Sequence, residues 1–248
     1  MADELFGLDE LRPAQVEAAA ACWTVRLAPM VRGMPDAHPI FATVFATVAA
    51  LGERTGYGRR RTEALAGAAG RLLIVGLGPG HDLHHLPATV TDVVAVEPEA
   101  TMRRYCARRV DRSPVPTRLV AAVAEELPLP DECVDAALVT LVLCSVADPA
   151  AAAAELHRVL RPTGTLHVLE HVHAVPGSRL AGWQDRLDPL WSGLAAGCHV
   201  TRDTREVLRI AGFDTGQLRK ANVRLAPPLV APQVVGTAHR LARPWHVI

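Results

Sequence analysis

The hydrophobic residues of this 248-residue chain fall into short runs that are separated by amphipathic segments. Five of these runs are apolar and rich in β-branched residues, a pattern typical of strands that are covered on both faces. They span residues 72–76, 92–97, 118–122, 134–144 and 165–171. Because the segments between them have helical spacing, the alternation predicts an α/β fold with a mostly parallel sheet, right-handed crossovers and helices on both faces.

The polar residues that begin and end helices support this alternation. Asp148 can cap a helix that has Pro149 at its first position and continues through residues 150–160. A second helix is predicted over residues 177–197, with an interruption at Pro189. Asp203 and Glu206 have capping-box spacing and begin a third helix. We expect two terminal strands, at residues 217–225 and 230–239, to complete a seven-stranded sheet.

Two segments lie outside this regular pattern. Residues 1–56 are mostly of helical character and contain several prolines, so we expect an N-terminal helical lid or extension. Residues 57–248 then form the main domain, in which residues 177–200 are expected to make a cover over the site.

Charge and composition exclude several classes of protein. The 26 basic residues balance the 26 acidic ones, so no nucleic-acid or anionic-membrane partner is predicted. The longest apolar stretch, residues 40–51, is shorter than the roughly 20 residues that cross a bilayer as a helix. The N-terminus also lacks the features of a secretory signal, so a cytoplasmic location is expected.

The spacing of cysteine and histidine predicts neither a disulfide framework nor a metal site. The five cysteines are odd in number and include no C-x-x-C pair. His81, His84 and His85 lie close together in the sequence, but their spacing supplies no complete ligand set.

The most informative feature is a glycine loop directly after the first strand. Gly76, Gly78 and Gly80 let the backbone turn tightly and approach a ligand, and they expose amides that favour a negative group. A dinucleotide-binding loop has a small residue at the next position, where this chain has His81, which opposes a nicotinamide-dependent dehydrogenase. The loop suits S-adenosylmethionine instead. Glu97 ends the second strand 21 residues after Gly76, where a carboxylate can accept both ribose hydroxyls.

These motifs resemble those of a known superfamily. LLIVGLGPG, VVAVEPEATM, AEELPLPDECVDAALVTLVLCSV and LHRVLRPTGTLHVLEHV are similar to successive motifs of class I S-adenosylmethionine-dependent methyltransferases with a type 11 domain. TLVLCSV, LEHV and QDRLDPLWSGLAAGCHVTRDT resemble the methyltransferase-like thiol S-methyltransferases in particular. The resemblance covers residues 57–240.

The resemblance implies S-adenosyl-L-methionine as cofactor and S-adenosyl-L-homocysteine as product. The implied cofactor-binding residues are Tyr57, Gly76, Leu77, Gly78, Pro79, Gly80, Asp82, Glu97, Pro98, Met102, Ala124, Glu125 and Leu141. Asp82 stands where the family often has asparagine, so its charge near the methionine carboxylate requires a capping or water-mediated explanation. Residues 1–56 differ from the membrane anchor of the mammalian members, so membrane attachment is not expected.

The candidate acceptor site favours thiol chemistry. A thiol with a pKa of about 8.5 is already a few per cent thiolate at neutral pH, whereas an alcohol needs a base. His171 is the preferred base, although a structural hydrogen bond explains it equally well, and His199 is the second candidate. Cys144 is expected to pack near the methyl group. Trp183, Leu187 and Trp191 are expected to wall the pocket or to belong to the core.

We therefore predict S-methylation of a small, fairly apolar thiol, such as a natural-product thiol or hydrogen sulfide. The alternatives are O- or N-methylation in secondary metabolism and a non-catalytic S-adenosylmethionine-binding partner subunit.

Overall fold

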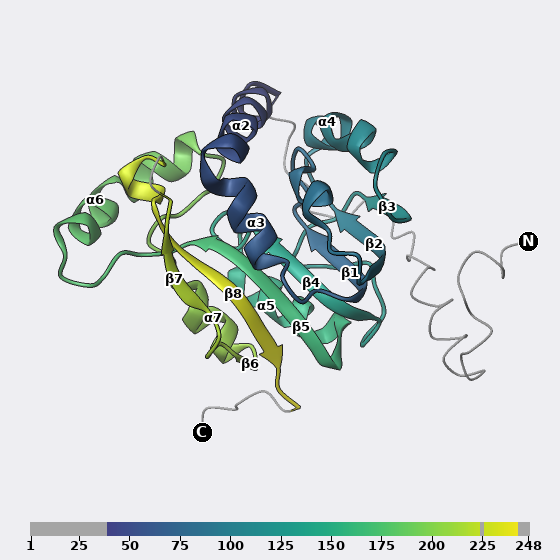
Figure 1. Cartoon of the computed structure of the whole chain (residues 1–248). Coiled ribbons are helices and arrows are strands. Elements are labelled where there is room, and N and C mark those ends of the chain that lie inside the picture. The colour runs from purple at the N-terminus through teal and green to yellow at the C-terminus, as the bar shows by residue number, and fades with distance from the viewer. Residues whose placement is uncertain (1–38, 224–225, 243–248) are drawn as a thin grey trace, which may run out of the picture.

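The computed structural model describes residues 39–223 and 226–242 (Figure 1). Residues 1–38 of the expected lid, the end of the expected strand at 217–225 and the last six residues lie outside the described residues.

One sheet organises the fold, and its first five strands run parallel. Its order is β3-β2-β1-β4-β5-β8-β6, and β7 also pairs with β8. Strand β8 is antiparallel to β5, β6 and β7. The strands are β1 Gly70–Val75, β2 Val90–Val96, β3 Thr117–Val120, β4 Val134–Thr140, β5 Leu160–His171, β6 Phe213–Asp214, β7 Arg219–Asn222 and β8 Pro232–Arg240. The predicted fold class is confirmed. The sheet has eight strands and not seven, because two short strands, β6 and β7, share the outer edge of β8.

Helices cover both faces of this sheet, with α3 on one face and α5 and α7 on the other (Figure 1). They are α2 Pro39–Gly52, the π-helix η3 Glu53–Tyr57, α3 Gly58–Ala64, the 3-10 helix η4 His81–His85, α4 Ala100–Val110, α5 Pro149–Val159, α6 Arg179–Leu194, α7 Thr204–Ile210 and the 3-10 helix η5 Pro228–Val230. Alternate residues of β1 enter two separate cores. Leu73 packs with Leu156 of α5, and Leu72 packs with Leu65 at the end of α3.

Several predicted features differ from the structure, and the fifth strand begins at Leu160 and not at Thr165. The fourth strand ends at Thr140 and not at Cys144, because Leu141 takes a left-handed φ of 58° that turns the chain out of the sheet. Helix α6 continues through Pro189, where an interruption was predicted. Pro189 and Asp185, four residues earlier, are both exposed, so the carbonyl that the proline leaves without a helical partner is open to water.

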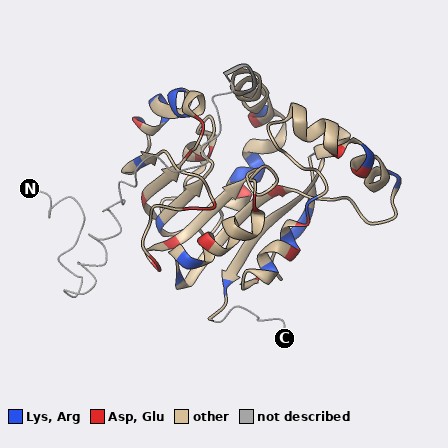
Figure 2. Cartoon of the chain, turned by 180° about the vertical axis from the view of Figure 1, so that it is seen from behind, with Lys and Arg blue, Asp and Glu red and all other residues tan. Residues whose placement is uncertain are grey.

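Acidic and basic residues are interspersed over the described elements (Figure 2). Within residues 39–223 and 226–242, no helix combines the length and the apolar character that crossing a membrane requires.

Candidate active site

The glycine loop closes one end of β1 and is packed less tightly at its middle glycine than at Gly76. Gly76, Gly78 and Gly80 have φ values of 66°, 55° and 87°, which side chains rarely tolerate. A Cβ on Gly76 would lie 2.5 Å from a Val142 methyl group, whereas one on Gly78 would meet nothing closer than the Phe45 ring at 3.9 Å. The loop is therefore packed against the β4 end of the sheet at Gly76 and open at Gly78.

The backbone N–H groups of this loop donate hydrogen bonds to acceptors within the protein. The sequence predicted instead that the loop presents them to a ligand. Gly76 and Leu77 donate to the Val96 carbonyl, and Gly80 donates to the Leu77 carbonyl. The Gly78 amide donates to the Glu97 carboxylate at 2.7 Å. These four N–H groups are therefore already satisfied within the protein.

The structure joins Glu97 directly to the glycine loop. Its carboxylate accepts from Gly78 and, at 3.0 Å, from the backbone N–H of Glu99. Burial raises the pKa of Glu97, while these two N–H groups favour its ionised form. Arg103 of α4 donates to the carbonyls of Glu97 and Pro98. Met102 is buried in the first turn of the same helix, where Glu99 caps its N–H.

The loop after β3 is fixed to the loop before α5. Ala124 is buried, and the Glu125 carboxylate accepts from the backbone N–H groups of Ala147 and Asp148, at 2.9 and 3.2 Å. Because the carboxyl ends of parallel strands meet at one edge, Ala124 lies at the same edge of the sheet as the glycine loop and Glu97.

A buried arginine neutralises the unusual Asp82. The Arg61 guanidinium donates to Asp82 at 2.6 Å and to Glu53 at 2.7 Å, and the Thr140 hydroxyl donates to Asp82 at 3.3 Å. Burial opposes the charge of Arg61, but the two carboxylates outweigh it and raise the pKa of Arg61 above its usual value. The charge of Asp82 is therefore balanced by an ion pair, and not by the capping or water-mediated contact that was expected. Sequence reasoning missed Arg61 because the two residues lie 21 positions apart.

Close to Asp82, the ring of His81 is buried, and its Nε2 has no hydrogen-bond partner among the described residues. A buried polar nitrogen without a partner is costly, so this atom favours a ligand group at the end of the glycine loop.

A compact cluster of sulfur and imidazole groups lies at the ends of β4 and β5. Nδ1 of His171 is 3.6 Å from the Cys198 sulfur and 3.9 Å from the Cys144 sulfur, and the two sulfurs are 3.7 Å apart. On the other side of the ring, Nε2 is 3.4 Å from the Tyr57 hydroxyl, which accepts from the Gln233 amide at 2.7 Å. Tyr57, predicted to contact the cofactor, thus lies beside the predicted base.

The two cysteines of this cluster titrate differently. The hydrogen bond that links the two thiols, together with the neighbouring His171, lowers the pKa of Cys198 to about 4, although burial opposes this shift. The same hydrogen bond and burial raise the pKa of Cys144. Sequence reasoning did not select Cys198, which lies 54 positions from Cys144.

Glu170 holds the loop that carries Cys144. Its carboxylate accepts from the backbone N–H groups of Val142, Leu143 and Cys144, at 2.7, 2.9 and 3.2 Å. Burial raises the pKa of Glu170 to about 6, although these three N–H groups favour its ionised form.

We expect Glu170→Ala to lower the free energy of unfolding by about 3 kcal/mol or more, because each buried N–H group left without a partner costs about 1–3 kcal/mol. Urea denaturation followed by circular dichroism measures this loss. The matched control is Glu126→Ala, which removes an exposed carboxylate and should change stability by less than about 0.5 kcal/mol. Equal effects of the two substitutions would contradict the role given to Glu170.

The remaining predicted residues lie around this cluster at different depths. Nδ1 of His199 is hydrogen-bonded to the Asp188 carboxylate at 2.7 Å, and His199 is not among the described residues that hydrogen-bond to His171. Trp191 lies within interaction distance of Cys198. Leu187 is half-buried, and Trp183 is 52% exposed, so Trp183 does not belong to the core.

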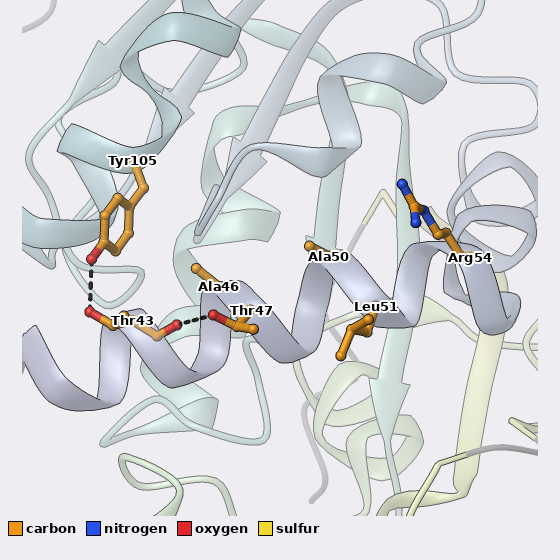
Figure 3. A pocket seen from close by; sticks show the side chains of 7 residues that line it. All are labelled: Thr43, Ala46, Thr47, Ala50, Leu51, Arg54 and Tyr105. Atoms are coloured by element: carbon orange, nitrogen blue, oxygen red, sulfur yellow. Dashed lines mark hydrogen bonds between the residues drawn. The ribbon is translucent and has the colours of Figure 1, made fainter.

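A groove of about 510 Å³ lies between α2 and α4 (Figure 3). The Thr43 hydroxyl bonds to the Tyr105 hydroxyl across one end of it, at 2.8 Å. Its walls are Thr43, Ala46, Thr47, Ala50, Leu51, Arg54 and Tyr105. None of these was predicted as a site residue.

Comparisons with known proteins complete the description of the site. A family model described as a methyltransferase domain matches residues 73–168. The chain is 33% identical to human thiol S-methyltransferase TMT1A over 181 residues, which cover 71% of this chain and 74% of that protein. It is 33% identical to rat thiol S-methyltransferase TMT1B over 174 residues, or 67% and 69% of the two chains. In fold it is similar to the Burkholderia thailandensis 1,6-didemethyltoxoflavin-N1-methyltransferase, whose structure contains S-adenosylhomocysteine; the TM-score is 0.53 at 21% identity, over 84% of this chain and 92% of that one.

Proposed function

Because the chain belongs to the class I S-adenosylmethionine-dependent methyltransferases, in the family of the thiol S-methyltransferases TMT1A and TMT1B, we propose that it S-methylates a small, fairly apolar thiol. The observation that carries this proposal is the 33% identity to these thiol S-methyltransferases over about two thirds of the chain. The cluster at the ends of β4 and β5 supports a small, fairly apolar thiol as acceptor. Around His171 it offers polarisable and apolar groups, namely Cys144, Cys198 and Tyr57.

The residues around the glycine loop fit S-adenosylmethionine. The Gly78 backbone lies beside the Glu97 carboxylate, which can accept ribose hydroxyls, and the buried Ala124 can flank an adenine ring. The unpartnered Nε2 of His81 offers a further polar contact at the end of the loop. When bound there, S-adenosylmethionine supplies an electrophilic methyl group on a sulfonium.

The protein then mainly has to position the acceptor. Orientation of two bound reactants contributes about 7–11 kcal/mol, whereas a positioned base adds roughly 10²- to 10⁴-fold. In this proposal the cover formed by α6 holds the acceptor at the ends of β4 and β5, and His171 receives its proton. A thiol ionises readily, so it depends less on His171 than a phenol or an alcohol does.

We expect the purified protein to methylate benzenethiol and benzyl mercaptan at least about 100-fold faster than phenol and benzyl alcohol, which differ only in the nucleophilic atom. Mass spectrometry of the methylated products and of S-adenosylhomocysteine measures these rates. Turnover of phenol or benzyl alcohol alone, or of aniline or benzylamine alone when these amines are added to the panel, would overturn the thiol proposal. Calorimetric binding of S-adenosylmethionine without turnover of any acceptor would indicate a non-catalytic subunit.

A further inference from the structure

The geometry of the sulfur and imidazole cluster points to a metal site: we propose that Cys144, His171 and Cys198 bind one Zn²⁺ ion, and that its open fourth position takes the sulfur of the methyl acceptor. The metal site rests on the structure alone, whereas the acceptor's place on it rests on the proposed thiol S-methylation. Neither the spacing of these residues in the sequence nor the chemistry already described assigns an ion here.

The distances within the cluster match tetrahedral coordination. With Zn–S bonds of about 2.3 Å and Zn–N bonds of about 2.0–2.1 Å, tetrahedral angles place two sulfurs about 3.8 Å apart and a sulfur and a nitrogen about 3.5 Å apart. The observed separations are 3.7 Å between the sulfurs and 3.6 and 3.9 Å from the sulfurs to Nδ1. The three donor atoms all lie within 4.8 Å of one another.

The donor set also matches the ion. Thiolate and imidazole are preferred zinc ligands, and a site with three protein ligands keeps a fourth position for water or substrate, as catalytic zinc sites do. A disulfide would use only the two cysteines and would require the sulfurs to approach to about 2.05 Å, which leaves the position of His171 unexplained.

The surroundings of His171 orient the correct nitrogen toward the sulfurs. Ligating histidines usually donate their other ring N–H to a fixed acceptor, which sets the tautomer. Here Nε2 lies 3.4 Å from the Tyr57 oxygen, and the buried amide of Gln233 holds that oxygen at 2.7 Å. This arrangement leaves Nδ1 available on the side of Cys144 and Cys198.

The backbone fixes the two cysteines against each other. The His199 amide, next to Cys198, donates to the Cys144 carbonyl at 2.7 Å, and Arg202 donates to the Leu143 carbonyl at 2.6 Å. The Glu170 carboxylate accepts a hydrogen bond from the Cys144 N–H group. The ligands therefore come from three separate segments that the fold already holds in place, as a preorganised site requires.

The location gives such an ion a role in methyl transfer. A thiol that coordinates zinc binds as the thiolate and releases its proton to water. His171, whose Nδ1 binds the ion in this proposal, is then a zinc ligand and does not receive the proton of a thiol acceptor. The bound sulfur then forms a bond to the methyl carbon, and the electron pair of the broken carbon–sulfonium bond stays on the departing sulfur, which becomes neutral. The thioether product carries no charge and is a weaker ligand than the thiolate, so it leaves the ion.

The direct test measures zinc in the full-length protein purified after growth with zinc. We expect one zinc per chain by elemental analysis, and at least a tenfold lower content in Cys144→Ser and Cys198→Ser. Cys133→Ala is the matched control, because it removes another buried cysteine and should retain the zinc. Thermal melting of each variant checks that it folds. Zinc content below about one tenth per chain, or equal content in the three variants, would overturn the site, as would a mass 2 Da lower that shows a disulfide.

Cobalt substitution identifies the ligands independently of activity. Co²⁺ bound to two thiolates should give sulfur-to-metal charge-transfer absorption in the wild-type protein, and Cys198→Ser should weaken it. Addition of benzenethiol should shift the visible bands if its sulfur enters the fourth position. A spectrum without thiolate bands would overturn the site, and bands unchanged by benzenethiol would overturn the acceptor's place on it.

Removal of the ion by a chelator tests the role of zinc separately from the proposed thiol S-methylation. A free alkyl thiol with a pKa of about 8.5 is about 3% ionised at pH 7, so we expect chelation to lower methylation of benzyl mercaptan up to about 30-fold there and much less at pH 9. Added Zn²⁺ should restore the rate. Thiol methylation that is unchanged at pH 7 after verified zinc removal would overturn the role of the ion while the proposed function stands. Bound zinc without any thiol turnover would leave the site intact and refute the proposed function.

Discussion

Replacing Glu97 by alanine is expected to weaken binding of S-adenosylmethionine by at least about 100-fold, because a charged acceptor of two hydrogen bonds contributes about 1.5–3 kcal/mol for each bond. The same carboxylate accepts from the Gly78 amide at 2.7 Å, so its removal also releases the middle of the glycine loop. Isothermal titration calorimetry with S-adenosylmethionine and with S-adenosylhomocysteine measures the loss for both forms of the cofactor.

Two further variants make this result specific. Glu126→Ala removes an exposed carboxylate close to Glu125 and should leave the affinity within about threefold, as expected for a surface substitution. Glu97→Gln keeps the shape of the side chain but lacks its charge, and should fall between wild type and Glu97→Ala. If Glu97→Ala folds normally and binds within threefold of wild type, then the cofactor does not use this carboxylate.

The fold was predictable because its signals are local. The five parallel strands, the helix capped by Asp148 and the glycine loop each depend on neighbouring residues in the chain. The wrong predictions concern features that depend on residues far apart in the sequence. The fourth strand ends early because Glu170 takes the amides of the loop that follows, and no pattern near Cys144 encodes a carboxylate 26 positions away.

The same distinction applies to the candidate site. The positions of Gly76, Gly78, Gly80 and Glu97 follow from the end of a strand and a fixed spacing, so sequence reasoning could select them. The cluster around His171 combines the ends of β4 and β5 with the turn after α6, and only the folded sheet brings these segments together. Cys198 could not be selected, because a lone cysteine beside a histidine has no defined chemistry until a second sulfur lies next to it.

Replacing Arg61 by methionine is expected to lower the free energy of unfolding by about 3–5 kcal/mol, which is the usual cost of leaving a buried charge without its partner. Asp82 is only 2% exposed, and Arg61 is its cationic partner among the described residues. Because whole domains are stable by only about 5–15 kcal/mol, urea denaturation should resolve this loss clearly.

The neighbouring Arg60 is the matched control. It lies on the same helix and pairs with Glu63 at 2.7 Å, but both side chains keep about a quarter of their surface in water. Exposed ion pairs contribute about 0–1 kcal/mol, so Arg60→Met should be nearly neutral. The double variant Arg61→Met with Asp82→Asn removes both charges and should recover most of the stability lost in Arg61→Met, since replacing a whole buried pair is often close to neutral. A double variant as unstable as Arg61→Met would show that the arginine stabilises the protein through Glu53 and packing, and not by neutralising Asp82.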